Sequence, residues 1–336
     1  MLSFALLGAG RIGIMHAQNI AEHPHATLAA VYDPSDTAAR AATESFGGVA
    51  SDNADDAIHA ADAVLIASAT QTHCDYIEQA VVANKPVLCE KPIHLDNARV
   101  KICRDKLAQY PHSLVQIGFN RRFDPGHAGL QARVAGGEIG KVEKLIITSR
   151  DPALPSADYL AAAGGLFRDM MIHDFDLARF ILNEEPARLV AAAATLITPA
   201  PLPDEADTAM VIMQTAGGAM CHINCSRRAV YGYDQRVEVL GDKGMLISGN
   251  RTATAVTHYN AQHTDAGEPL LHFFIDRYAD SYRRQLDAFI TAVDHRVAPS
   301  PSLADGQRAL ILAEAAEQSY RLGQWTIMAD FEQRFE

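Results

Sequence analysis

The sequence lacks several features that would assign a protein to a particular class. None of its apolar runs approaches the ~20 residues that a membrane-spanning helix needs. Lysine and arginine total 29 against 41 acidic residues, for a formal net charge of −12, and the basic residues form no run. Nucleic acid and anionic membranes are therefore not expected partners. The apolar start, MLSFALL, has no basic segment and runs into glycines, which is atypical of a secretory signal.

Cysteine is also scarce and irregularly placed. The five cysteines are Cys74, Cys89, Cys103, Cys221 and Cys225. An odd number without regular spacing favours reduced thiols and, with no export signal, a cytoplasmic protein. Cys221 and Cys225 flank His222, as metal ligands can. The surrounding GAMCHINCSRR alternates as a strand does, so we expect buried or half-buried thiols instead.

What the chain does contain is typical of a globular protein of two domains. Of its 336 residues, 48% are apolar and 21% are charged. In the first 120 residues, strand patterns at 3–7, 28–32, 63–67, 86–89 and 113–117 alternate with helix patterns at 12–22, 37–45, 73–83 and 98–110. This alternation predicts a parallel, doubly wound sheet with helices on both faces.

The pattern changes after Arg122. Strands are expected at 142–149, 189–197, 208–214, 219–225, 236–240 and 244–248, with a helix inserted at 164–181, a proline-rich loop at 198–207 and a helical tail from 276 to 322. Successive strands predict an α+β domain built on a large, mostly antiparallel open sheet. We therefore expect domains at 1–121 and 122–336, with the C-terminal helix packing back on the first.

A glycine-rich motif, GAGRIG, follows the first predicted strand and opens the first predicted helix. Its spacing is GxGxxG, which allows a tight turn, close approach of a pyrophosphate and tight packing of helix on strand. The residues expected to contact such a cofactor are Gly8, Gly10, Arg11, Ile12 and Gly13. The motif in this context predicts a dinucleotide-binding Rossmann domain.

Asp33 ends the second predicted strand, twenty residues after Gly13. A carboxylate at this place bonds the ribose 2′-hydroxyl of NAD. Pro34 and Ser35 follow it, so the 2′-phosphate of NADP would meet an unpaired negative charge. The position favours NAD. The alternative is a glycine turn without a ligand and an Asp33 that caps the next helix.

Titratable residues are unusually frequent in the predicted helix GGLFRDMMIHDFDLARFI (164–181). Asp169 and His173 are four residues apart, so on one helix they point the same way. An aspartate beside a histidine can orient the ring and stabilise the imidazolium of a general base. The alternatives are a buried, hydrogen-bonded histidine on a helix with a solvated acidic face, or a metal site that includes Asp176. We expect Asp174 and Asp176 to cap the helix, pair with Arg179 or remain solvated.

A third motif, Glu90-Lys91-Pro92, follows the strand pattern at 86–89, where strand ends of a doubly wound sheet face the ligand. With GAGRIG and the HDFD helix, it resembles the glucose-fructose oxidoreductase / inositol dehydrogenase (Gfo/Idh/MocA) family of NAD(P)-dependent sugar oxidoreductases over essentially the whole chain. The stretches GFNRRFDP (118–125), GGLFRDMMIHDFDLARF (164–180) and SRRAVYGYDQRVEVLG (226–241) are most similar to its inositol 2-dehydrogenases.

The resemblance implies NAD-dependent oxidation of a cyclic polyol, most similar to the conversion of myo-inositol to 2-keto-myo-inositol, without a metal. It implies that Lys91, Asp169 and His173 are catalytic. We expect His173 to be the base and Asp169 its partner, while Lys91 either stabilises the alkoxide or carries the proton. The alternatives are another inositol isomer or a pyranose as substrate, and a non-catalytic NAD-binding sensor.

The resemblance also implies further ligand contacts and an assembly. The cofactor contacts expected in addition are Ser68, Thr70, His73, Glu90 and Lys91. The expected substrate contacts are Lys91, Arg121, Asp151, Asp169, His173, Tyr233 and Tyr282. Around Ala69 and Thr70 the family often has a proline, so the loop contacts depart from its pattern here. Of Arg121 and Arg122, one is expected at a ligand and the other in an ordinary ion pair. The open sheet is expected to pack against a partner's sheet in a homo-oligomer, a tetramer in this family.

Overall fold

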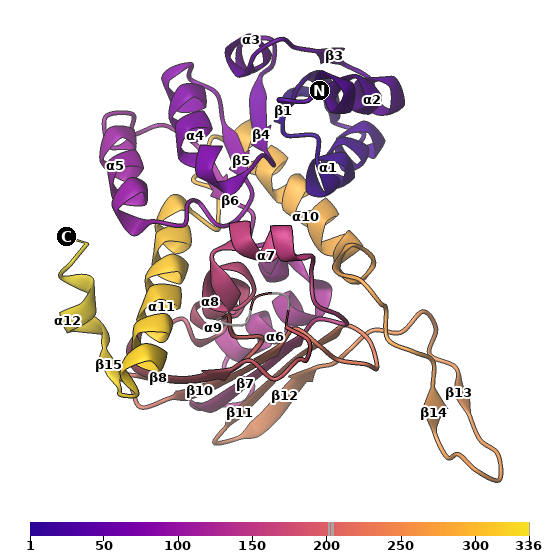
Figure 1. The fold of residues 1–336 in the computed structure, drawn as a ribbon, viewed down its shortest axis with the longest axis vertical. Coiled ribbons are helices and arrows are strands. Elements are labelled where there is room, and N and C mark those ends of the chain that lie inside the picture. The colour runs from indigo at the N-terminus through magenta and orange to yellow at the C-terminus, as the bar shows by residue number, and fades with distance from the viewer. Residues whose placement is uncertain (201, 203–204, 336) are drawn as a thin grey trace. The chain divides into compact units, whose positions relative to one another are not determined.

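A computed structural model describes the whole chain except residues 201, 203, 204 and 336. The chain forms two compact units. The first unit comprises residues 1–120 and 281–310, and the second comprises residues 121–280 and 311–334. Figure 1 shows their helices and strands. None of the described helices is both long and apolar enough to span a membrane.

The first unit is a doubly wound parallel sheet, as predicted. Its strands are β1 (Leu2–Leu7), β2 (Ala26–Tyr32), β3 (Val49–Ala50), β4 (Ala63–Ile66), β5 (Val87–Cys89) and β6 (Val115–Ile117). They lie in the order β3-β2-β1-β4-β5-β6, which reverses direction at β1. The connecting helices are α1 (Arg11–Glu22), α2 (Asp36–Phe46), α3 (Ala54–His59), α4 (His73–Val82) and α5 (Asn97–Leu107). The sequence patterns had not indicated β3 and α3, which are short.

A late helix completes the core of the first unit. Helix α10 (Phe274–His295) contributes Leu286, Phe289 and Ile290 to the apolar cluster that contains Phe4 and Leu6 of β1. The rings of Phe4 and Phe289 are 6.0 Å apart. Burying each such side chain stabilises the fold by about 1.5–3 kcal/mol. The first unit therefore needs a segment that follows its last strand by more than 160 residues, since β6 ends at Ile117 and the segment begins at Ser281.

Two of the three motif glycines are required by packing. Gly8 has a φ of +103°, and a Cβ there would lie 2.5 Å from the Ser68 amide nitrogen. A Cβ on Gly13 would lie 2.0 Å from the Gly8 carbonyl oxygen. Gly10 differs, because a Cβ there would meet nothing within 4 Å. The chain thus leaves open space beside the N-terminus of α1.

The second unit is an α+β structure on a large, mostly antiparallel sheet, as predicted. Its strands are β7 (Val142–Arg150), β8 (Pro186–Ala194), β9 (Thr208–Thr215), β10 (Met220–Ser226), β11 (Asp234–Gly241), β12 (Gly244–Ser248) and β15 (Thr326–Ile327). They lie in the order β12-β11-β7-β10-β9-β8-β15. Only the β7–β10 pair is parallel.

Helices cover one face of this sheet. They include α6 (Pro125–Ala135), α8 (Gly165–Asp169) and α9 (Ile172–Leu182), all on the same side in Figure 1. The unit also contains α7 (Ala157–Ala163), α12 (Met328–Glu332), the second half of α11 (Leu303–Leu322) and a hairpin of β13 (Thr257–His258) and β14 (Ala266–Gly267). On β9 the side chains alternate between buried and solvent-facing, with Met210 and Ile212 50% and 44% exposed. The opposite face of the sheet is therefore apolar and open in the single chain.

One helix prediction was wrong, because the helix is not continuous. The helix predicted at 164–181 is interrupted after Asp169, where the amides of Met170 and Met171 both bond to the Leu166 carbonyl at 3.1 Å. One of these bonds spans five residues instead of four, so the helical repeat is lost at this point. The predicted helical tail is confirmed, and it consists of two helices, α10 and α11, because Pro299 and Pro301 lie between them and cannot continue a helix. The loop predicted at 198–207 lies partly outside the described residues.

The glycine geometry predicts losses of stability of unequal size for two alanine substitutions. Gly13→Ala should lower the free energy of unfolding by about 2–4 kcal/mol, because its Cβ would overlap a backbone oxygen. Gly10→Ala should cost less than about 1 kcal/mol, because its φ of −72° suits alanine and its Cβ meets open space. Chemical denaturation of both variants measures this, and equal losses would contradict the packing argument.

Candidate active site

The N-terminus of α1 is open to an anion. Gly10 is the N-cap residue of α1 and supplies no side-chain cap, so the first amides of the helix have no such partner. Arg11 is exposed and Ile12 half-buried at the start of the helix. The amides of the first helical turn and the helix dipole favour a phosphate here, and the open space beside Gly10 lets one approach. The motif residues present therefore fit a dinucleotide.

Asp33 lies directly beside this turn. Its carboxylate accepts hydrogen bonds from the Ala9 and Ser35 amides, each at 2.8 Å. It does not cap α2, because the N-cap is Ser35, whose hydroxyl accepts from the Ala38 amide. The alternative of a helix-capping Asp33 is therefore wrong. The carboxylate is held at the glycine turn, where a ribose would follow the pyrophosphate.

The loop after β4 is joined to the Glu90-Lys91-Pro92 segment. His73 is 2% exposed, with Nδ1 2.8 Å from the Pro92 carbonyl oxygen and Nε2 3.0 Å from that of Ser68. Burial lowers the pKa of His73. Ser68 bonds Thr72 at 2.8 Å around the short turn that begins at Thr70. His73 thus fixes the two loops on which Ser68 and Lys91 lie, and its contact with the cofactor stays a prediction.

Glu90 is held from two sides. Its Oε1 lies 2.8 Å from Nε2 of His16, a buried residue of α1. Behind it, a Cβ on Gly118 would lie 2.9 Å from the Glu90 carboxyl carbon. The ring of Tyr282 packs edge-on against His16 at 5.6 Å and is 5% exposed. These contacts fix the backbone from which Lys91 projects, whereas substrate contact by Tyr282 stays a prediction.

In the second unit, Asp169 is the centre of a polar cluster. The Tyr159 hydroxyl of α7 donates a hydrogen bond to its Oδ1 at 2.8 Å. Arg227, which follows β10, donates to its Oδ2 at 3.0 Å and is 1% exposed. Asp169 ends α8, and the half-buried His173 lies in the first turn of α9. The two predicted residues therefore flank the break between these helices.

Asp151 belongs to the same cluster. It follows β7, and its amide and carbonyl bond to Ser226 and Ala229 at 2.9 and 2.7 Å. Burial raises the pKa of Asp151 to about 6, with a further upward contribution from the Asp169 carboxylate and an opposing one from Arg227. A carboxyl group that titrates near neutrality is typical of sites that bind or move protons.

Arg121 and Arg122 both form buried ion pairs. Arg121 pairs with Asp174 and donates to the Ser149 hydroxyl at 3.2 Å. Arg122 pairs with Asp176, with Nε 2.8 Å from Oδ2. The aspartates are 0% and 1% exposed, so neither remains solvated and the alternative of a solvated acidic face was wrong. The expected pairing with Arg179 is confirmed for Asp176, at 4.0 Å. The helix buries these carboxylates because each meets a guanidinium from the segment that opens the second unit.

Tyr233 is also interior. It is 6% exposed and packs edge-on against Tyr278, with ring centroids 6.0 Å apart. Burial raises its pKa well above the ordinary range, so its hydroxyl stays protonated. Its predicted hydrogen bond to a polyol is not tested by these contacts.

The pattern Cys221, His222 and Cys225 forms no converging set. All three lie on β10, where the cysteines are buried on one face and His222 lies on the other. Cys225 donates to the Asp174 carboxylate at 3.1 Å. The expected strand with buried thiols is confirmed.

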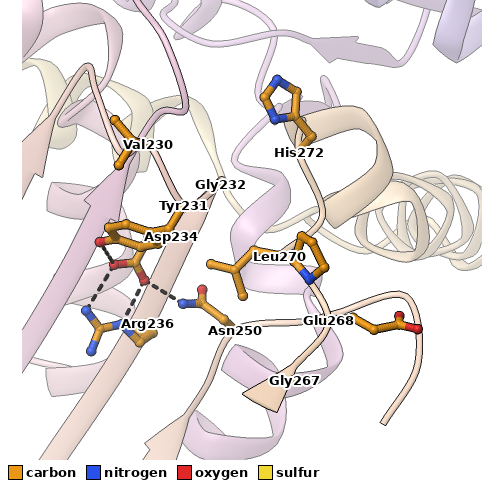
Figure 2. Close-up of a pocket in the computed structure, with 11 residues that line it drawn as sticks. Val230, Tyr231, Gly232, Asp234, Arg236, Asn250, Gly267, Glu268, Leu270 and His272 are labelled. Atoms are coloured by element: carbon orange, nitrogen blue, oxygen red, sulfur yellow. Dashed lines mark hydrogen bonds and ion pairs between the residues drawn. The ribbon is translucent and has the colours of Figure 1, made fainter. Parts of the chain in front are cut away.

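The second unit also contains an open pocket with a volume of about 890 Å³. Figure 2 shows it between the loop around Tyr231 and the base of the β13–β14 hairpin. Asp234, one of the charged residues that line it, is already hydrogen-bonded to Tyr231, Arg236 and Asn250. None of the predicted site residues lines it.

The structure thus brings the predicted residues together in two sets. Within the first unit, the glycine turn lies with Asp33, and the Ser68–His73 loop with Lys91. Within the second, Asp169 and Asp151 share the cluster at Arg227. Sequence reasoning missed the roles of His16 and Arg227, which lie 74 and 58 residues along the chain from Glu90 and Asp169. It also missed the role of Tyr159, which is 10 residues from Asp169. Arg227 does stand in a motif that resembles a family, but nothing in its spacing indicated Asp169.

Comparison with known proteins identifies both parts of the chain. Residues 2–118 match a family described as "Oxidoreductase family, NAD-binding Rossmann fold", and residues 127–247 match the "GFO/IDH/MocA C-terminal domain". An inositol 2-dehydrogenase of Rhizobium meliloti is 44% identical over 94% of this chain and 96% of its own length.

Solved structures agree with this. A myo-inositol dehydrogenase from Corynebacterium glutamicum superimposes with a TM-score of 0.93 at 40% identity, covering 97% of this chain and 98% of its own. A scyllo-inositol dehydrogenase from Lactobacillus casei, with bound NAD(H) and scyllo-inositol, superimposes with a TM-score of 0.89 at 29% identity, covering 98% and 99%.

The raised pKa of Asp151 predicts a pH-dependent stability. A folded-state pKa of about 6, above the ordinary value of 3.8, means that the folded state loses stability as pH rises from about 4 to above 6. The free energy of unfolding of Asp151→Asn, relative to that of the wild type, should therefore rise by about 1–3 kcal/mol between pH 4 and pH 8. Urea unfolding at the two pH values measures this.

Asp234→Asn is the matched control, because its hydrogen-bonded carboxylate has a lowered pKa and stabilises the fold at neutral pH. It should lose stability at pH 8. If both variants shift in the same direction with pH, the assignment of Asp151 is wrong.

Proposed function

Since the chain belongs to the Gfo/Idh/MocA family of oxidoreductases, we propose that it catalyses the NAD-dependent oxidation of myo-inositol to 2-keto-myo-inositol. The observation that carries this proposal is the 44% identity to an inositol 2-dehydrogenase over 94% of the chain. The Asp169 cluster supports it, because a charged, partly buried aspartate flanks the histidine that would act as base.

The first unit, or the domain at 1–121 with the late segment 281–310, binds the cofactor. The amides beside Gly10 hold the pyrophosphate, and Asp33 bonds the ribose hydroxyls and disfavours the 2′-phosphate of NADP. Ser68, Thr70 and Glu90 would contact the bound cofactor from the loops that follow β4 and β5. Bound NAD supplies the hydride acceptor.

The polyol is bound, and its proton removed, by residues of the second unit together with Lys91 and Tyr282 of the first. His173 accepts the hydroxyl proton, and the Asp169 carboxylate stabilises the resulting imidazolium. Lys91 places a positive charge beside the developing alkoxide or relays the proton. Asp151, Tyr233 and Tyr282 contribute hydrogen bonds to the ring hydroxyls. Arg121, being bound to Asp174, acts by holding α9 as well as by its charge.

A second candidate substrate is scyllo-inositol. The observation that favours it is the scyllo-inositol dehydrogenase of Lactobacillus casei, which is 29% identical over 98% of the chain. The two substrates differ only in the orientation of one hydroxyl, so a few hydrogen bonds decide between them. Another polyol or a pyranose would be discriminated in the same way.

The direct test is a panel of inositols and sugars with NAD and NADP, followed by the absorbance of the reduced cofactor. We expect myo-inositol with NAD to give the highest kcat/KM. His173→Ala should lower kcat by about 10²–10⁴-fold while leaving NAD affinity unchanged, because it removes the base. His112→Ala, an exposed histidine of the first unit, is the control and should be neutral.

If His173→Ala turns over normally, the assignment of the base is wrong. If the wild type reduces neither cofactor with any polyol or sugar, the chain is a binding protein and not a dehydrogenase.

We also propose that the chain forms a homotetramer through the open face of the second unit's sheet. The apolar side chains exposed there are Met210, Ile212, Met220, Met245 and Ile247. They lie on β9, β10 and β12 of one sheet, and so large an apolar surface favours a partner. A second copy of the chain offers the same surface in two-fold symmetry.

Ile212→Asp should therefore weaken the assembly to smaller species in sedimentation velocity at micromolar concentration. Ile102→Asp, an equally drastic change at an exposed residue of α5 in the first unit, should leave it intact. A wild-type monomer, or equal effects of the two changes, would contradict the proposed interface.

The proposed role is polyol catabolism in the cytoplasm. All five cysteines are free thiols, which suits a reducing compartment. Cell fractionation with an antibody against the chain checks this location.

A further inference from the structure

The Asp169 carboxylate is held by two side chains that the sequence motifs had not singled out. Tyr159 donates to Oδ1 at 2.8 Å and Arg227 to Oδ2 at 3.0 Å, so each oxygen has its own donor. Burial, together with the Asp169 charge, raises the pKa of Tyr159 above its usual range, so its hydroxyl remains a donor. These two contacts fix both the rotation and the charge of the carboxylate.

Arg227 is built into the interior to an unusual degree for an arginine. It is 1% exposed, and its amide bonds to the Asp207 carbonyl at 2.8 Å. Its Nη2 lies 3.7 Å from the Glu205 carboxylate, and its Nε has no hydrogen-bond partner among the described residues. Burying a guanidinium with an unused donor costs free energy, and an apolar side chain at position 227 would fill the same space without that cost.

The charges around Asp169 explain why a cation is needed there. Asp151 faces the cluster from the end of β7, Glu205 from the loop before β9, and Tyr159 from α7. His173 follows on α9, and the guanidinium of Arg227 contacts Asp169. Without Arg227, carboxylates in a partly desolvated space would repel one another, and one would take up a proton.

We propose that Arg227, together with Tyr159, is a positioning pair that keeps Asp169 ionised and correctly oriented beside His173. This inference rests on the proposed function, in which Asp169 stabilises the imidazolium of His173. The proton moves from the substrate hydroxyl to a ring nitrogen of His173, and Asp169 remains a carboxylate throughout. In this proposal Arg227 acts on the base through Asp169, which it contacts directly.

The test compares Arg227→Gln, Arg227→Lys and Tyr159→Phe with Arg228→Gln. Arg228 is the matched control, because it is the adjacent residue, carries the same charge and is exposed. Each variant is assayed with myo-inositol and NAD for kcat and KM across pH 5–10, for NAD affinity by fluorescence, and for thermal unfolding.

Arg227→Gln should lower kcat about 10- to 100-fold, the range expected for loss of a charge-assisted hydrogen bond. It should also move the acid limb of the pH profile of kcat/KM to higher pH, because Asp169 then accepts a proton more readily. In Arg227→Lys, the acid limb of the pH profile should lie close to its wild-type position, because lysine retains the positive charge. NAD affinity should not change in any variant.

If Arg227→Gln does not fold, Tyr159→Phe still tests the inference. This variant should fold, because Tyr159 is half exposed and only its hydroxyl is lost. It should lower kcat several-fold with a smaller shift of the same limb. The inference is overturned if folded Arg227→Gln or Tyr159→Phe matches Arg228→Gln in kcat and in pH profile. If the wild type and Arg228→Gln are themselves inactive with inositols, the proposed function fails instead.

Discussion

Two adjacent ion pairs inside the second unit hold the helix that carries His173. Arg121 and Arg122 follow one another at the start of this unit, and they bind Asp174 and Asp176 of α9. Each aspartate is almost fully buried, so separating either pair leaves an uncompensated charge at a cost of about 3–5 kcal/mol. Since His173 directly precedes Asp174, α9 cannot rotate to redirect its histidine without breaking these pairs.

The same principle holds at the other proposed catalytic positions. Asp169 is bonded at both carboxylate oxygens, by Tyr159 and Arg227. Lys91 follows Glu90, which His16 and the close approach of Gly118 hold in place. Each group that would meet substrate or cofactor thus stands on or beside a residue whose position is fixed by buried polar contacts. Rigid support of this kind is what brings reacting groups into a defined geometry.

The interruption between α8 and α9 is part of this arrangement. In a continuous helix, Asp169 and His173 would be related by one regular turn, and Asp169 would share the anchoring of Asp174 and Asp176. The extra residue in the turn at Met171 separates the two helices. Asp169 can then be held by α7 and by the segment after β10, while His173 stays with α9. The aspartate and the histidine are therefore anchored independently.

Local patterns in the sequence determined much of the fold and part of the site. The alternation of strands and helices, the GxGxxG turn before α1, the place of Asp33 and the succession of strands after Arg122 all depend on spacings within about 20 residues, which a sequence displays directly. The tertiary structure alone decided the burial of Asp174 by Arg121, 53 residues away, and the binding of Asp169 by Arg227, 58 residues away. It also decided that residues 281–310 complete the first unit. A buried charge is stable only beside its partner, and no pattern along the chain specifies which distant residue the fold brings to it.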